Sequence, residues 1–217
     1  MHKKFIAIFC LALQSVGSHA AGLVGNVTDS DGQAVADAVI SLMPLNRNHL
    51  PPLDTVQMAK MDQWQKQYVP YDLPVLVGAE VSFPNKDNIK HHVYSFSQAK
   101  RFELKLYSGI NAEPVLFDKP GVVVLGCNIH DWMLGYIYVL ETPYFVKTDD
   151  TGHMVIENVP DDDYIVSVWH PRLRGTTKEH DQKISLQGQT ASSVSFTIKL
   201  KRERRRRRLP DFEVEEY

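Results

Sequence analysis

The sequence predicts an all-β fold for this chain of 217 residues. Apolar and polar residues alternate with a period of two in short segments such as 80–83, 102–106 and 194–198, as expected for strands with one buried face. Turn-forming residues separate such segments at DSDGQ, FPNKDN, YSGINAEP, FDKPG and TDDTG. This number of predicted strands and turns fits either one large β domain or two smaller ones.

The N-terminal segment 1–20 has the three parts of a secretory signal. A basic start (MHKK) precedes an apolar run (FIAIFCLALQSV) and a stretch of small residues (GSHA). We expect cleavage after Ala20 or Ala21 and a periplasmic mature protein. Cys10 raises the alternative of a lipoprotein, but Phe9 stands where such a site needs a small residue. No later segment is apolar for the ~20 residues that a membrane helix needs, so no integral membrane segment is expected.

The region 55–67 is the one segment with a helical spacing. Met58, Met61 and Trp64 recur every three residues, which predicts a short helix, or an irregular connection, with a methionine-lined core face. Methionine commonly fills gaps in a core, so this reading is favoured over a methionine-rich copper-binding tract.

The charge is nearly balanced, with 24 Lys and Arg against 26 Asp and Glu, which argues against nucleic acid as a partner. The exception is the segment 201–217, in which an arginine run is followed by acidic residues. Blocks of like charge seldom fold, so this tail is expected to be disordered. An alternative is that Arg204–Arg208 docks on an acidic partner or on an anionic membrane surface.

Two distant segments, GLVGNVTDSDGQAVADAVISLMP and VKTDDTGHMVIENVPDDDYIVSVWHPRL, together resemble a carboxypeptidase-regulatory or transthyretin-like β-sandwich. Asp161 departs from that family, which usually has Gly before the Tyr. The resemblance implies a split sandwich of residues 21–45 and 143–200, with residues 46–142 inserted as a second domain. Assigning strands 22–44 to the central domain is the alternative.

The segment GCNIHDWMLGY places Cys127, His130 and Met133 three residues apart. Loss of the signal would remove Cys10 and leave Cys127 without a disulfide partner within the chain, although exported proteins mainly use cysteine in pairs. Thiolate, imidazole and thioether donors together favour copper, because thioether is a poor ligand for zinc. A blue-copper centre needs a second imidazole, and the HHV segment at His91 and His92 is the candidate.

The central region resembles the cupredoxin family of plastocyanin- and amicyanin-like blue copper proteins, which are linked to methylamine utilisation. The resemblance rests on SFPNKDN, then HHV, then GCNIHDWM, followed by Gly and an aromatic-rich strand. It implies a Greek-key β-sandwich that binds one type 1 copper ion through His91, Cys127, His130 and Met133. His92 stands where the family commonly has Asn, so the choice between His91 and His92 is open; strand alternation favours His91.

Motifs for a serine nucleophile, a zinc protease or a phosphate loop are not found, so the chain is not expected to be an enzyme. The sequence instead predicts a periplasmic one-electron carrier that uses a redox partner protein it does not identify. The alternative is a periplasmic protein that buffers or delivers copper.

Overall fold

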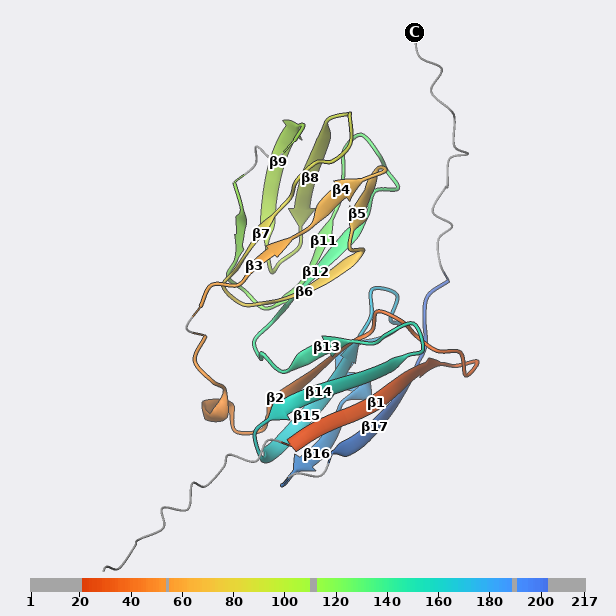
Figure 1. Cartoon of the computed structure of the whole chain (residues 1–217). Helices are drawn as coiled ribbons and strands as arrows, with labels where there is room; N and C mark the ends of the chain where they lie inside the picture. The colour runs from red at the N-terminus through yellow and green to blue at the C-terminus, as the bar shows by residue number, and fades with distance from the viewer. Residues whose placement is uncertain (1–20, 54, 110–112, 189–190, 203–217) are drawn as a thin grey trace, which may run out of the picture.

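The computed structural model describes residues 21–53, 55–109, 113–188 and 191–202. The predicted signal and residues 203–217 of the predicted tail lie outside this part of the chain. The described residues form strands and two short 3₁₀ helices, η1 (Arg47–His49) and η2 (Thr177–His180), which confirms the predicted all-β class. Figure 1 shows them as two lobes, called here the upper lobe and the lower lobe.

The lower lobe is built from the two ends of the described chain. Its strands are β1 (Ala21–Asp29), β2 (Val39–Pro44), β13 (Phe145–Lys147), β14 (His153–Val159), β15 (Asp162–Trp169), β16 (Gln182–Leu186) and β17 (Ser192–Ile198). They form two sheets, ordered β14-β1-β17 and β13-β2-β15-β16, whose buried apolar side chains share one core cluster. The specific likeness of this lobe to a transthyretin-like sandwich stays a prediction.

The upper lobe holds the middle of the chain. Its strands are β3 (Met58–Lys60), β4 (Asp62–Trp64), β5 (Gln67–Val69), β6 (Asp72–Leu76), β7 (Ala79–Ser82), β8 (His91–Phe96), β9 (Arg101–Tyr107), β10 (Val115–Phe117), β11 (Gly121–Leu125) and β12 (Gly135–Leu140). They pair as β10-β7-β3, β11-β12-β6, β4-β5 and β8-β9, and a bridge between Tyr94 and Gly126 joins β8 to the end of β11. A second core cluster fills this lobe.

The predicted helix at 55–67 is wrong, because this segment forms β3, β4 and the start of β5. Met61 and Gln63 are buried, whereas Met58 and Trp64 are more than half exposed, so the inward positions follow the period of two of a strand. The turn is made by Gln65 and Lys66, which both take positive φ values of 51° and 57°. Such turns usually carry Asn or Gly, which explains why the sequence gives no hairpin signal here.

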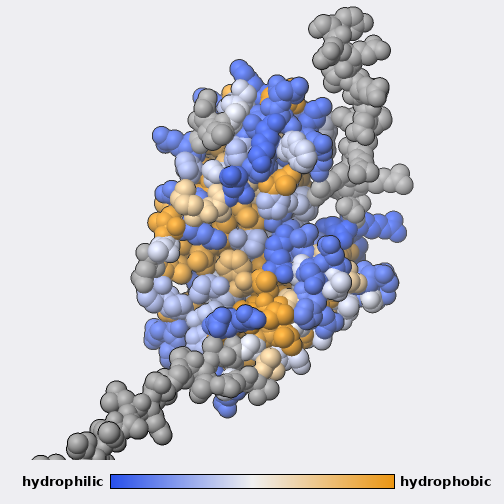
Figure 2. All heavy atoms as spheres, in the orientation of Figure 1, coloured by the Kyte–Doolittle hydropathy of each residue, from blue (hydrophilic) through white to orange (hydrophobic). Residues whose placement is uncertain are grey.

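The two lobes meet at a mixed apolar and ionic junction. Trp169 of the lower lobe packs on Tyr138 of the upper lobe, with ring centroids 4.7 Å apart. Beside it, the Lys147 Nζ lies 2.7 Å from an Asp37 oxygen and 3.2 Å from an oxygen of the buried Asp72. Figure 2 shows hydrophobic residues gathered across the middle of the visible face, where the lobes adjoin.

None of the helices among the described residues has the length and apolar character needed to cross a membrane.

Candidate metal centre

Cys127 lies at the end of strand β11, in a position fixed by aromatic neighbours. Gly126, just before it, exchanges two backbone hydrogen bonds of 3.0 and 3.1 Å with Tyr94 of β8, and its carbonyl accepts a bond of 2.9 Å from the Tyr68 hydroxyl. A Cβ on Gly126 would lie 2.7 Å from the Tyr94 ring. Only glycine therefore allows the close approach that holds the start of the Cys127–Met133 loop.

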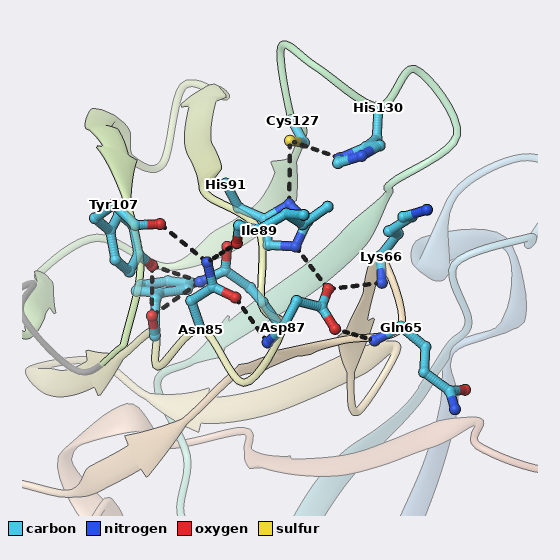
Figure 3. A network of polar contacts seen from close by, with 11 residues as sticks. Gln65, Lys66, Asn85, Asp87, Ile89, His91, Tyr107, Cys127 and His130 are labelled. Carbon is cyan, nitrogen blue, oxygen red and sulfur yellow. Dashed lines mark hydrogen bonds and ion pairs between the residues drawn. The ribbon is translucent and has the colours of Figure 1, made fainter. Parts of the chain in front are cut away.

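Three metal-binding side chains converge at this point. The Cys127 Sγ lies 3.9 Å from the His91 Nδ1 and 3.7 Å from the His130 Nδ1. One ligand atom from each residue falls within 4.8 Å of the others, and all three residues are buried. Figure 3 shows that His91 comes from the start of β8 and His130 from the loop that follows Cys127. The fold thus brings together residues 36 positions apart in the sequence.

Met133 closes the same loop. Its amide donates to the His130 carbonyl at 2.9 Å, and its side chain is 2 % exposed within the core cluster that also contains Cys127. The apolar residues between and after these positions point outward instead: Ile129, Trp132 and Leu134 are 38–49 % exposed. The loop therefore has a buried side that carries the candidate ligands and an exposed apolar side.

His91 and His92 have separate surroundings, although both are buried. The His91 ring faces Cys127, whereas the His92 Nε2 lies 2.8 Å from the Glu103 Oε1 on the neighbouring strand β9. Adjacent residues in a strand point to opposite faces of the sheet, so the two imidazoles do not compete for one position. The structure places His91, and not His92, against Cys127 and His130.

Asp87 contacts the other nitrogen of His91. The His91 Nε2 lies 2.7 Å from the Asp87 Oδ2, and the carboxylate also accepts backbone N–H bonds from Gln65 at 2.6 Å and Lys66 at 2.9 Å. Asn85 fixes the loop that carries Asp87, because its side chain donates to the Ile89 and Tyr107 carbonyls and accepts from the Asp87 amide. Figure 3 shows this chain of contacts running from the β4–β5 turn to Cys127.

Burial and hydrogen bonds act in opposite directions on the charges of this site. Burial alone would raise the pKa of Cys127, but the bond to His91 and nearby backbone N–H groups bring that pKa below its usual value. Burial likewise opposes the charge on Asp87, yet the N–H groups of Lys66, His91 and Gln65 hold its pKa below the usual range. Burial, followed by the neighbouring His91, lowers the pKa of His130. Both Cys127 and Asp87 are therefore biased toward their anionic forms.

The β4–β5 turn is the part of this site that the sequence did not indicate. Asp87 had a weak signal, since an acidic residue after SFPN belongs to the pattern that identified the His91 strand. Gln65 and Lys66 had none, because they contribute only their backbone N–H groups and any residue type except proline carries one.

Comparison with protein-family models and with curated proteins finds no match. Among solved structures, the chain is similar to cupredoxins and to a copper enzyme of related fold. A purple cupredoxin from Nitrosopumilus maritimus is 23% identical over 38% of this chain and 99% of its own, with a TM-score of 0.31. Amicyanin from Paracoccus versutus is 16% identical over 46% of this chain and 98% of its own, with a TM-score of 0.34.

The copper-containing nitrite reductase from Thermus scotoductus SA-01 is 23% identical over 43% of this chain, with a TM-score of 0.37. The chain spans only 24% of that enzyme's length. These similarities each cover less than half of the chain.

Proposed function

We propose that the protein is a type 1 copper protein that carries one electron at a time in the periplasm. The observation that carries the proposal is the buried convergence of His91, Cys127 and His130. Two imidazoles and one thiolate in a plane, with a weak axial thioether, are the donors of a blue-copper centre. Met133 supplies the only thioether in that loop, and its side chain is buried in the same core cluster.

The spacing of the donor atoms fits a metal ion. With bonds of ~2.0 Å to nitrogen and ~2.3 Å to sulfur, a nitrogen donor and a sulfur donor about 120° apart around an ion would lie about 3.7 Å from each other. The measured distances from the Cys127 Sγ to the two imidazole nitrogens are 3.7 and 3.9 Å. A thiol buried for packing alone would not need two imidazole nitrogens at that separation.

Copper fits this donor set better than zinc. Zinc prefers closed tetrahedral sets of Cys, His or carboxylate ligands, whereas the further donor beside this group is the buried thioether of Met133, a poor ligand for zinc. A bound copper ion supplies the capacity to accept and release one electron. The residues around it keep the donors in one geometry, exclude water and leave an apolar face beside His130, whose ring centroid lies 5.2 Å from that of Trp132.

The exposed apolar face favours an electron carrier over a copper buffer or delivery protein. Ile129, Trp132 and Leu134 lie within four residues of His130 in the sequence and are partly exposed, and Trp132 packs on the His130 ring. Exposed apolar groups of this kind mark docking surfaces, and a partner docked there would lie close to the metal. Delivery of copper would instead need donors that can leave the site, and His91 and Cys127 are both held within strands or at a strand end.

The experiment is copper loading of the mature protein, compared with Cys127→Ser. We expect an intense visible thiolate-to-copper band in the wild type, because the Cys127 thiolate is the donor that gives rise to it, and loss of this band in Cys127→Ser. Glu103→Gln, which changes a residue outside the site, is the matched control and should keep the band. A colourless wild type that takes up only zinc would contradict the proposal.

Repeated reduction and reoxidation distinguishes the two copper functions. An electron carrier should recover its full colour through many cycles with one copper retained, whereas a buffer or delivery protein should lose copper to a competing chelator in the reduced state. The non-enzymatic role stays a prediction, and turnover of nitrite by the loaded protein would contradict it.

A further inference from the structure

We infer that Asp87 is a positioning residue, held by the β4–β5 turn, that fixes the orientation and proton of His91 and thereby favours the cupric state of the site. This inference rests on the proposed copper function for its effect on the metal. Its structural part, the position of the proton on the His91 ring, can be tested in the metal-free protein.

The first step is the assignment of the proton on His91. An ionised carboxylate can only accept hydrogen bonds, so the bond of 2.7 Å to the Asp87 Oδ2 requires the proton on the His91 Nε2. The other ring nitrogen, Nδ1, faces the Cys127 Sγ at 3.9 Å, so it is the donor left for a metal once any proton that it shares with Cys127 is released. His91 is fully buried and the Asp87 side chain is 11% exposed, so water does not easily replace this bond.

The second step is the origin of the position of Asp87. Gln65 and Lys66 are consecutive non-glycine residues with positive φ, a strained conformation that persists only where the surroundings hold it. Their two N–H groups both point at the Asp87 carboxylate, at 2.6 and 2.9 Å. The strained turn and the carboxylate therefore stabilise each other, and the turn has a structural reason tied to the site.

The third step is the effect on a bound metal. A carboxylate that accepts the second N–H of a ligating imidazole fixes the ring and makes the imidazole a stronger donor. Stronger donation favours the more highly charged cupric ion over the cuprous ion. Asp87 should therefore lower the reduction potential of the site and increase the affinity for Cu(II).

The chain contains a matched control. His92 and Glu103 form a second histidine–carboxylate pair of nearly the same length, 2.8 Å, on the neighbouring residue of the same strand. That imidazole does not face Cys127, so a change at Glu103 alters the same kind of contact without reaching the donor atoms.

The metal-free wild type tests the structural part. Nitrogen-15 spectra of the histidine rings at mildly alkaline pH should show a slowly exchanging proton on the His91 Nε2. Asp87→Asn should make this proton exchange faster. The Asn side chain carries no negative charge to hold the His91 N–H, and its NH₂ group would face the backbone N–H of Gln65, so the side chain is held less firmly. A wild-type His91 that carries no proton on Nε2 would overturn the inference, whatever metal the protein binds.

The copper-loaded protein tests the effect on the metal. Asp87→Asn should lower the affinity for Cu(II) by about tenfold or more. If the affinity for Cu(I) stays the same, each tenfold loss of Cu(II) affinity raises the reduction potential by about 59 mV. Asp87→Glu, which keeps the charge, should recover part of the change, and Glu103→Gln should have little effect. Equal shifts of the reduction potential and of the Cu(II) affinity in Asp87→Asn and Glu103→Gln would overturn the inference.

The two readouts separate failure of this inference from failure of the proposed function. If the wild type binds no copper, the proposed function fails, and the ring spectra of the metal-free protein still decide the role of Asp87. If the blue colour is present and Asp87→Asn leaves both potential and ring proton unchanged, only this inference fails.

Discussion

The two lobes of the protein have similar apolar cores but bury different kinds of polar side chain. The core cluster of the lower lobe consists of apolar side chains such as Leu42, Val166 and Phe196. The upper lobe also buries Gln63, Asn85 and three histidines, each with partners that orient it. Burying polar groups is costly unless they are hydrogen-bonded. The upper lobe places its buried polar groups around the donors of its site, whereas buried lower-lobe hydroxyls such as Thr142 and Thr148 bond to neighbouring backbone.

The difference between the lobes is tested most strongly by a large-to-small substitution in each core separately. Phe196→Ala in the lower lobe should lower the free energy of unfolding by about 4 kcal/mol, because Phe196 is almost fully buried. The visible copper band at room temperature should not change. Phe83→Ala is the upper-lobe counterpart, because the buried Phe83 ring packs on Phe102 in the core cluster that also contains Cys127, and it should alter the band.

Denaturation and visible absorption measured on both variants check this prediction. If Phe196→Ala alters the band as strongly as Phe83→Ala does, the site depends on the lower lobe and the two cores are not separable.

The next largest expected effect is the dependence of stability on pH at His170, a buried residue that follows Trp169 of the junction and feels the charges of Asp37 and Lys147. Burial, followed by the charge of Arg172, lowers the pKa of His170 from 6.5 to about 4. The unfolded chain therefore takes up a proton between these pH values that the native chain does not, so stability is lost as the pH falls from about 7 to 4. The loss is about 3 kcal/mol, and His170→Gln should remove it.

Denaturation midpoints at several pH values measure this effect. Asp72 is the control with the opposite sign, because burial raises its pKa to about 6 and its native form therefore gains stability as the pH falls. Asp72→Asn should steepen the acid loss. Identical pH profiles for the wild type and His170→Gln would contradict the assignment.

Met133→Gln tests the axial position within the upper lobe. A weak axial ligand tunes the potential without being essential for binding, so the variant should keep its copper and its colour. The harder oxygen donor favours the cupric ion, and the potential should fall by about 59 mV, equivalent to about 1.4 kcal/mol. Leu134→Gln places the same side chain on the exposed side of the loop as a control. An unchanged potential and spectrum in Met133→Gln would remove Met133 from the site.

The smallest expected effect concerns the β4–β5 turn. Lys66→Gly relieves the left-handed conformation but keeps the backbone N–H that binds Asp87, so it should stabilise the protein by about 1 kcal/mol. Asn158 also has a φ of 57°. Asn158→Gly should stabilise the protein less than Lys66→Gly does, because Asn tolerates this conformation. Thermal unfolding of both variants checks the prediction, and destabilisation by Lys66→Gly would mean that the lysine side chain matters.

The sequence by itself determined the all-β class, from the period of two, and the identity of the close trio of candidate ligands, from their spacing around an unpaired cysteine. These features are local, since alternation and a short loop involve residues that are neighbours along the chain. The sequence also carried the pattern that marks the HHV strand, although it left His91 and His92 as alternatives.

The tertiary structure alone decided which histidine faces Cys127, because that depends on how β8 pairs with β9 and with the end of β11. It also showed that residues 55–67, expected to be helical, form β3, which pairs with β7, and most of the β4–β5 hairpin. The helical spacing of Met58, Met61 and Trp64 was coincidental, since long-range pairing with β7 and the carboxylate of Asp87 outweigh the weak local preference of the segment. A backbone N–H that holds a distant carboxylate leaves no mark on residue type, so only the folded chain reveals it.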